Sequence, residues 1–211
     1  MKKITLLLFL AFASCGISYD GETRLISETT VLDRNGNFLS GIEIKIRAVN
    51  GSDEDLISSG FSNSYGNTRL IFVPPKNASI EISFSNEELG YDNKIFRSIK
   101  SSDFDNYKLI MDEVILLKSD DIVDLEVRFN NSFNTNKTLI NSRVQGLLSG
   151  WQHLYQENTE IDSFYPSYFS AAKNQTIIVH YTLLDTITQE KTEHMFPILI
   201  ENESVSEIIN Y

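Results

Sequence analysis

Four groups of chemistry-bearing residues stand out in this chain of 211 residues: one cysteine, three histidines, an oxygen-rich turn and a cluster of aromatic rings. The histidines are His153, His180 and His194, and neither an H-E-x-x-H motif nor a tight His and Cys group accompanies them. The usual zinc signatures are therefore absent from the sequence. His180 and His194 come close only if the register of a C-terminal hairpin suits. We expect structural histidines and no metal site.

The oxygen-rich turn is DRNGN at residues 33–37, which begins like a calcium-binding loop. An EF-hand loop needs glycine at its sixth position and glutamate at its twelfth, where this chain has Phe38 and Ile44. Asn-Gly is also the dipeptide of tight hairpin turns, because both residues tolerate positive φ. We expect a hairpin turn here, with calcium binding as the weaker alternative.

Motifs of catalysis are missing from the sequence. There is no G-x-S-x-G nucleophile pattern, no G-x-G-x-x-G and no phosphate-binding loop with lysine. Paired carboxylates such as Glu87-Glu88 and Asp120-Asp121 fall in expected loops, where solvation accounts for them. We therefore expect no enzymatic activity, no catalytic residue and no cofactor.

The aromatic cluster lies between residues 151 and 169 and contains Trp151, Tyr155, Phe164, Tyr165, Tyr168 and Phe169. Exposed rings beside amide side chains stack on sugars or grip protein partners, so Trp151, Tyr155, Tyr165 and Tyr168 form a candidate binding surface. The competing interpretation, which we rank first, is that several rings complete a hydrophobic core, Trp151 above all.

The single cysteine, Cys15, follows a segment with the three parts of a secretory signal. Lys2 and Lys3 precede an apolar run, and small residues follow it. The run is too short to cross a bilayer, which needs about 20 helical residues. We expect residues 1–14 to be a cleaved signal peptide.

Residues 12–15 (FASC) resemble a bacterial lipobox, in which cleavage occurs before a cysteine that carries diacylglycerol; Phe12 departs from the usual aliphatic residue. Exported proteins normally pair their cysteines, and this chain has only one. The resemblance implies lipidation of Cys15. Residues 11–13 (AFA) also fit an ordinary signal peptidase site, and Cys15 would then be a free thiol.

Removal of residues 1–14 takes away two lysines and no acid, so the net charge falls from −11 to −13. Such a surface repels phosphate backbones, which argues against nucleic-acid partners. Residues 15–23 are a polar segment that we expect to be a tether, and the eight residues after Cys15 reach at most about 28 Å when fully extended.

Beyond residue 24 the pattern is that of β-strands separated by Gly, Asn and Pro turns. In FLSGIEIKIRAV, Ile42, Ile44 and Ile46 alternate with charged residues, which indicates a half-buried strand. Residues 86–108 are less regular and are expected to be an insertion with one short strand. This spacing of strands is typical of an antiparallel sandwich.

The stretches LDRNGNFLSGIEIKI, SSGFSNSYGNTRLIFVPPKNASIEISF and MDEVILL together resemble a carboxypeptidase regulatory-like domain. This family implies a small transthyretin-like or Ig-like sandwich with a non-catalytic, accessory role. Phe38 stands where the family often has proline, and Asn63 and Asn67 occupy turn positions. We assign residues 24–119 to this domain.

Residues 120–211 are expected to form a second sandwich. IVDLEVRF alternates, residues 139–155 fit either a helix or a strand pair, and two strands close the chain. Pro197 in the last run indicates an edge strand or a bulge.

The sequence therefore predicts an all-β protein of two antiparallel β-sandwich domains after a cleaved signal peptide. We expect a non-catalytic, lipid-anchored cell-envelope protein with a structural or protein-interaction role, in the outer membrane of a Gram-negative bacterium. Its partners would be the membrane, through the lipid, and envelope proteins or glycans. The alternatives are a carbohydrate-binding accessory lipoprotein that uses residues 151–169, and a secreted or periplasmic soluble protein.

Overall fold

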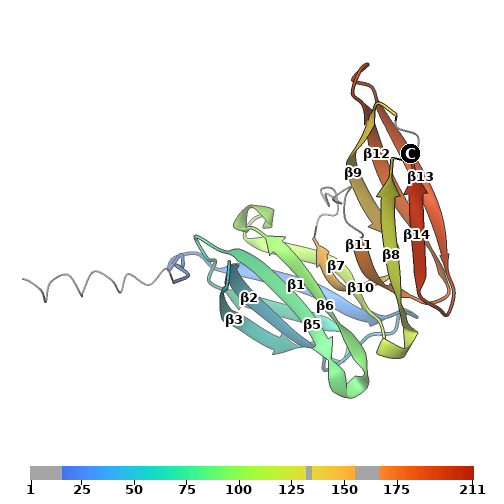
Figure 1. Ribbon diagram of the computed structural model, residues 1–211. Coiled ribbons are helices and arrows are strands. Elements are labelled where there is room, and N and C mark those ends of the chain that lie inside the picture. Colours follow the sequence, from blue (N-terminus) through green and yellow to red (C-terminus); the bar gives the residue numbers. More distant parts are fainter. Residues whose placement is uncertain (1–15, 132–134, 155–166) are drawn as a thin grey trace, which may run out of the picture.

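The computed structural model describes residues 16–131, 135–154 and 167–211, and this part of the chain is built almost entirely of strands (Figure 1). The strands are Leu25–Asp33 (β1), Glu43–Asn50 (β2), Asp53–Phe61 (β3), Asn67–Phe72 (β4), Ser79–Asn86 (β5), Tyr91–Ile99 (β6), Lys108–Leu116 (β7), Ile122–Asn130 (β8), Lys137–Gln145 (β9), Leu148–His153 (β10), Ser167–Ala172 (β11), Gln175–Asp185 (β12), Lys191–Ile200 (β13) and Val205–Asn210 (β14). The all-β expectation is confirmed. Among the described residues, no helix has the length and apolar character needed to span a bilayer.

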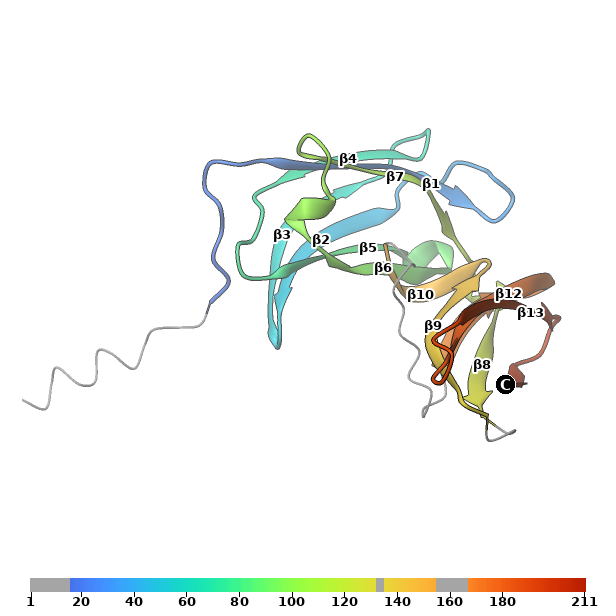
Figure 2. The same ribbon diagram turned by 90° about the horizontal axis from the view of Figure 1, so that it is seen from above.

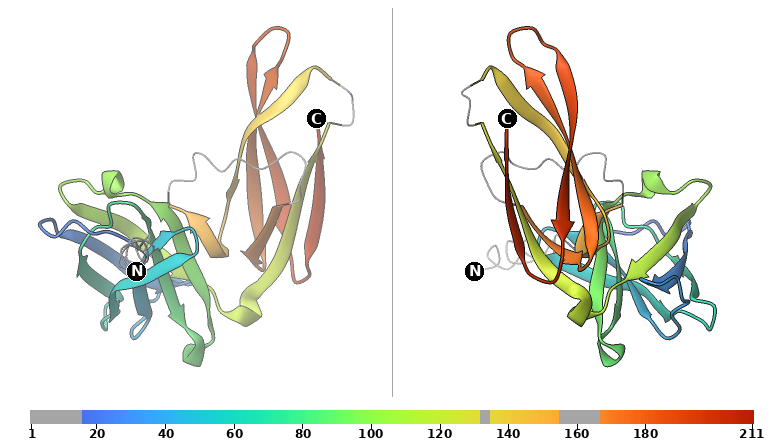
Figure 3. Two further views of the ribbon diagram at one scale, coloured as in Figure 1. Left: turned by 60° about the vertical axis from the view of Figure 1, so that its left-hand side comes forward. Right: turned by 90° about the vertical axis from the view of Figure 1, so that its right-hand side faces the viewer.

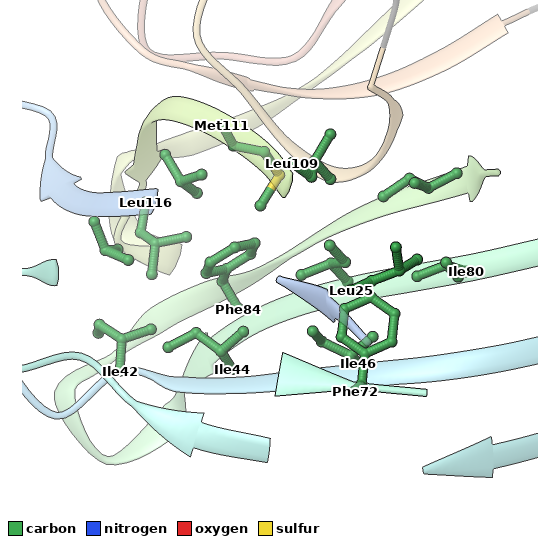
Figure 4. Close-up of a cluster of buried hydrophobic side chains, with 14 of the residues drawn as sticks. Leu25, Ile42, Ile44, Ile46, Phe72, Ile80, Phe84, Leu109, Met111 and Leu116 are labelled. Carbon is green, nitrogen blue, oxygen red and sulfur yellow. The ribbon is translucent and has the colours of Figure 1, made fainter. Parts of the chain in front are cut away.

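The first sandwich places a three-stranded sheet, β4-β1-β7, over strands β6-β5-β2-β3 (Figure 2). The alternating isoleucines of the sequence point inward as expected: Ile42, Ile44 and Ile46 are at most 1% exposed. They meet Phe84 and Leu116 between the two layers (Figure 4). Period-two alternation therefore buries one face of β2 and leaves its charged residues outside.

The second sandwich packs strands β14-β8-β11-β10 against the sheet β13-β12-β9. Its core contains Leu125, Val127, Ile177 and Val179, each fully buried. Pro197 lies in β13, the edge strand of its sheet, and the register with β12 runs past it without a shift. An edge strand tolerates the missing N–H donor, so of the two expectations for Pro197 the edge strand is confirmed.

Two local expectations differ from the structure. Residues 139–154 contain most of β9, all of β10 and no helix, but β9 and β10 do not pair with each other: β9 pairs with β12, and β10 pairs with β6 and β11. The segment expected as an irregular insertion, residues 86–108, contains the nine-residue strand β6 inside the large sheet. Both segments are stabilised by pairing with strands far away in the sequence, and the local spacing of apolar residues does not predict which strands pair.

Most pairings are antiparallel, and three are parallel: β1 with β7, β14 with β8, and β10 with β6. The 3-10 turn Ser119–Asp121 (η4) connects β7, the last strand of the first core, to β8, the first strand of the second. The buried residues of the first hydrophobic cluster lie between residues 25 and 116, and those of the second lie between residues 125 and 209. We keep 24–119 and 120–211 as the proposed domains.

The two sandwiches share one eight-stranded sheet, which is continuous through β10. Leu148 and Ser149 pair with β11, whereas residues 150–153 pair with β6. The change of partner falls at Gly150, whose φ of 73° lies in the left-handed region that glycine adopts at little cost. β10 therefore leaves the second sandwich and adds a strand to the first, with the two sandwiches at an angle to each other (Figure 3).

A buried lysine reinforces this junction. Lys94 in β6 is only 9% exposed, and its Nζ donates to the carbonyl oxygens of Ile115 in β7 and Leu148 in β10, each at 3.3 Å. One amine thus joins both layers of the first sandwich to the first residue of β10. Burial lowers the pKa of Lys94 to about 8, because the charged form loses its hydration.

The described part of the segment expected to be a tether is hydrogen-bonded to the first sandwich from Gly16 onward. The backbone N–H of Ser18 donates to the Asn77 side chain at 2.8 Å, and that of Asp20 donates to the Pro74 carbonyl at 3.0 Å. The Tyr19 hydroxyl donates to Asp55 at 2.7 Å. Asn77 Nδ2 also donates to the Gly16 carbonyl oxygen at 3.4 Å, so the described part of the expected tether lies against the folded body from its first residue.

Lys94 makes the stability of the fold depend on pH. The folded state holds the proton less tightly than the unfolded state, so the free energy of unfolding rises with pH from about 8 upward. Between pH 7 and 9.5 we expect an increase of about 2 kcal/mol. Tyr19, Tyr91 and Tyr181 have raised pKa values and stay neutral in this range.

Urea unfolding at both pH values, with the Lys94→Met variant as the control, measures this increase. The wild-type protein should gain stability, and Lys94→Met should show a flat profile, because it has no amine to titrate. Parallel profiles for the two proteins would show that Lys94 is not buried as described.

Candidate functional site

Two of the four candidate binding residues lie in the described part of the chain, and both are exposed. Trp151 in β10 is 57% exposed and Tyr168 in β11 is 66% exposed. The core interpretation is therefore wrong for these two rings. Phe169, the next residue in β11, does pack against the second core. Tyr155 and Tyr165, like Cys15 and Phe164, lie outside the described residues.

Trp151 and Tyr168 line the same cavity, which has a volume of about 400 Å³. β10 and β11 pair only at Leu148–Ala171 and Ser149–Ser170, after which β10 follows β6 and β11 follows β8. The cavity is lined by β10 on one side and by β11 and β8 on the other, and we call it the fork pocket. Its volume falls in the range of small-molecule sites.

The alternation of the strands decides which side chains reach the fork pocket. In β8, Leu125 and Val127 point into the core, so Asp124 and Glu126 point to the opposite face. The register pairs Glu126 with Tyr168 of β11 and with Ser206 of β14. Apolar lining comes from Val144, Leu148, Phe169 and Val205, at the edge of the second core.

Glu126 is held as an ionised carboxylate. Its Oε1 accepts from Arg128 Nε at 2.7 Å, and its Oε2 accepts from the Ser206 hydroxyl at 2.9 Å. The hydrogen bond from Arg128 lowers the pKa of Glu126 most, followed by that from Ser206, with a further contribution from the Tyr168 hydroxyl. The same carboxylate raises the pKa of Arg128. These groups form a fixed polar patch beside the Tyr168 ring.

Trp151 is oriented by a cation from the first sandwich. The Arg97 guanidinium carbon lies 5.9 Å from the centroid of the indole ring, within the range of a cation–π contact. Arg97 Nε is itself paired with Glu81 Oε2 at 3.0 Å, in strand β5. One ring of the fork pocket is therefore positioned by β10, β6 and β5, and the other by the second sandwich.

His180 and His194 do not converge. In the β12–β13 hairpin, His180 pairs with Met195 while Tyr181 pairs with His194, so the two histidines point to opposite faces. His180 Nε2 lies 2.8 Å from Gln145 Oε1, and His194 stacks on Tyr181 with the ring centroids 5.0 Å apart. Among the residues that the structure describes, no group of three potential metal ligands occurs.

The oxygen-rich turn at residues 33–37 is closed by hydrogen bonds of its own. Asp33 Oδ1 accepts from the backbone N–H groups of Asn35 and Asn37, and Oδ2 accepts from the Asn37 side chain at 2.9 Å. Gly36 has a φ of 81°, as the Asn-Gly turn requires. The turn interpretation accounts for these residues.

Several residues of the fork pocket escaped the analysis of the sequence. Alternation in residues 122–129 marks Asp124 and Glu126 as outward-facing, but it does not show which strand lies beside β8. Ser206 and Arg143 carry no local signal at all. The register of β14 on β8 brings Ser206 to Glu126, and the register of β11 on β8 brings Tyr168 to the same carboxylate.

No protein-family model matches this chain, and no curated protein matches it. The resemblance to carboxypeptidase regulatory-like domains therefore stays a prediction, while the β-sandwich that it implied is present.

Solved structures match weakly. The TIE protein of Bacillus anthracis is 15% identical over 89% of this chain and 34% of its own, with a TM-score of 0.32. The shaft pilin SpaA of Lactobacillus rhamnosus GG is 9% identical over 89% and 98%, with a TM-score of 0.35. The tip fimbrial protein Mfa3 of Porphyromonas gingivalis is 7% identical over 87% and 84%, with a TM-score of 0.31. The chain spans a third of the first of these proteins, and similarities of this size assign no function.

The exposure of Trp151 can be measured directly, because it is the only tryptophan. We expect its fluorescence maximum to lie at the long wavelength of a solvated indole, and acrylamide to quench it readily. Arg97→Ala should increase the quenching further, because it removes the group that covers one face of the ring. A short-wavelength maximum that acrylamide barely quenches would contradict the exposure of Trp151 and show that its ring is buried.

Proposed function

We propose that this chain is a lipid-anchored, non-catalytic binding protein of the cell envelope, which holds its ligand in the fork pocket. The observation that carries the proposal is the pocket itself: two exposed aromatic rings, Trp151 and Tyr168, flank an apolar cavity between paired strands. Binding sites are typically concave and apolar, with a few placed polar groups. Exposed rings on a rigid scaffold provide contact area at low entropic cost.

The electrostatics of Glu126 argue against a general-acid role in the pocket. A catalytic general acid needs a carboxyl group whose pKa is raised towards neutrality. Glu126 has the opposite property, since Arg128, Ser206 and Tyr168 all stabilise its charged form. Its hydrogen bonds keep the Glu126 carboxylate ionised, so this group has no proton to transfer to a substrate.

The position of the pocket suits an anchored protein. Residues 16–20 lie at the end of the first sandwich that is remote from the second sandwich (Figures 1 and 2). A lipid on Cys15 would therefore hold the first sandwich at the membrane and present the fork pocket further out. We propose the outer membrane of a Gram-negative bacterium as the location, with envelope proteins or glycans as partners. A secreted or periplasmic form is the alternative if Cys15 stays unmodified.

Carbohydrate binding is a second candidate function, and one specific observation favours it. Trp151 and Tyr168 are both exposed and line one cavity, which is one of the conditions for rings that stack on sugars. In a purely structural role, nothing would require these rings to remain accessible to solvent.

Cys15→Ala tests the anchor. Wild-type protein should sediment with membranes, and its intact mass should exceed that of the chain from Cys15 by the attached lipid. Cys15→Ala should be released, because several acyl chains contribute about 0.8 kcal/mol per buried methylene and the variant has none. Ser18→Ala, three residues further on, is the matched control and should stay anchored. A mature chain that begins at Ser14 with no added mass would contradict the anchor.

The released Cys15→Ala protein also tests the pocket. It should co-sediment with purified cell-envelope fragments, and the added pair Trp151→Ala and Tyr168→Ala should abolish this binding. Tyr65→Ala, which removes a ring that is 67% exposed elsewhere, is the control and should bind normally. Equal binding by the pocket variant and the control would contradict a role for the fork pocket.

A further inference from the structure

The first described residue, Gly16, is already held by the body of the first sandwich. Asn77, in the loop between β4 and β5, donates to the Gly16 carbonyl oxygen at 3.4 Å and accepts from the backbone N–H of Ser18 at 2.8 Å. Cys15 precedes Gly16 directly, and consecutive Cα atoms are about 3.8 Å apart. A lipid on Cys15 would therefore have no spacer and would hold this end of the sandwich against the bilayer.

The layer β4-β1-β7, which lies uppermost in Figure 2, has an exposed apolar group on its outer side at the same end. Ile26, at the start of β1, pairs with Ile71 at the end of β4. The backbone N–H of Ile26 donates to the Tyr107 carbonyl oxygen at 2.9 Å, and Ile110 follows in β7. Ile71 is 48% exposed, and Tyr107 and Ile110 are each 65% exposed. We call these four residues the end patch.

The charges around the end patch cancel. Glu28, which pairs with Ile110 across the strands, forms ion pairs with Arg69 at 3.0 Å and with Lys108 at 2.5 Å. Segments 16–28, 69–76 and 100–108 surround the patch and contain five acids and five bases, namely Asp20, Glu22, Glu28, Asp103 and Asp105 against Arg24, Arg69, Lys76, Lys100 and Lys108. The further acids at this end, residues 53–55, belong to β3 in the other layer. The patch therefore lies in a neutral region of a chain whose net charge is −11.

Tyr107 has a backbone conformation that a ring-bearing residue seldom adopts. Asn106 and Tyr107 both have positive φ, of 47° and 67°. The turn is closed by the Lys108 N–H, which donates to the Asp105 carbonyl oxygen at 2.8 Å. Glycine in place of tyrosine would form such a turn with less strain. Strained residues cluster at functional sites, and this one is a tyrosine, a side chain enriched at membrane–water interfaces.

We infer that the end patch rests on the lipid bilayer, with the Tyr107 ring among the head groups and the isoleucines at the boundary of the acyl chains. This inference rests on the lipid anchor of the proposed function and names the surface that the anchor brings to the membrane. A bilayer is the occupant that the position favours, because Gly16 is fixed at the same end of the sandwich. Apolar side chains bind at this boundary in proportion to the area that they bury. The protein would then stand on the membrane in one orientation and would not swing on a tether.

Brominated lipids test the inference, because bromine on the acyl chains quenches an indole only at short range. Each protein combines Trp151→Phe, which removes the natural tryptophan, with one new probe: Tyr107→Trp, Ile110→Trp, or Tyr65→Trp as the control. Tyr65 is 67% exposed and lies in the turn between β3 and β4, at the opposite end of the first sandwich. The lipid-modified proteins are bound to phosphatidylcholine vesicles with and without brominated chains, and flotation verifies the binding.

We expect Tyr107→Trp and Ile110→Trp to lose emission on the brominated vesicles and to emit at shorter wavelength on both kinds of vesicle, and Tyr65→Trp to do neither. The inference is overturned if either probe loses no more emission than Tyr65→Trp in protein that floats with the vesicles. A patch that is covered by another protein would give this result, and the anchor and the fork pocket would still stand. Lipid-modified protein that does not float overturns the anchor and the inference together.

Discussion

The structure depends on the two-sided pairing of β10. Residues 148–149 belong to the second sandwich and residues 150–153 to the first, and Gly150 makes the change of partner possible. Without this strand the chain would be two sandwiches connected by a turn at residues 119–121. With it, hydrogen bonds join both into one eight-stranded sheet. Lys94 adds a second constraint, because its buried amine hydrogen-bonds to the Leu148 carbonyl at the start of β10.

The candidate site is a consequence of this pairing. Because β10 departs from β11 after two residues, a cavity remains where two neighbouring strands would otherwise close on each other. Trp151 enters it from the first sandwich side, and Tyr168 and Asp124 from the second. A site built on strands from both sandwiches is only as rigid as their junction. The buried amine and the Arg97–Glu81 ion pair are therefore part of what positions the aromatic rings.

Much of the fold could be predicted from the sequence, because period-two alternation and turn residues are local signals. Alternation predicts the inward isoleucines before and within β2 and the half-buried pattern of β8, and Pro197 predicts an edge strand or a bulge. The identity of strand neighbours is not a local property, so the central position of β6 and the fork at Gly150 were missed. Trp151 was ranked as a core residue because large rings are usually buried, and only the departure of β10 from β11 shows that it is exposed.

Hydrogen exchange measured by mass spectrometry tests the pairing of β10 most directly. If β10 is a strand of the first sandwich, those amides of residues 150–153 that point towards β6 should exchange slowly, as should the paired amides of β5 and β2 in the same sheet. Gly150→Val should speed their exchange, since a β-branched residue is strained at a φ of 73°. Free exchange of residues 150–153 in the wild-type protein, with β2 and β5 still protected, would contradict the shared sheet and the fork pocket built on it.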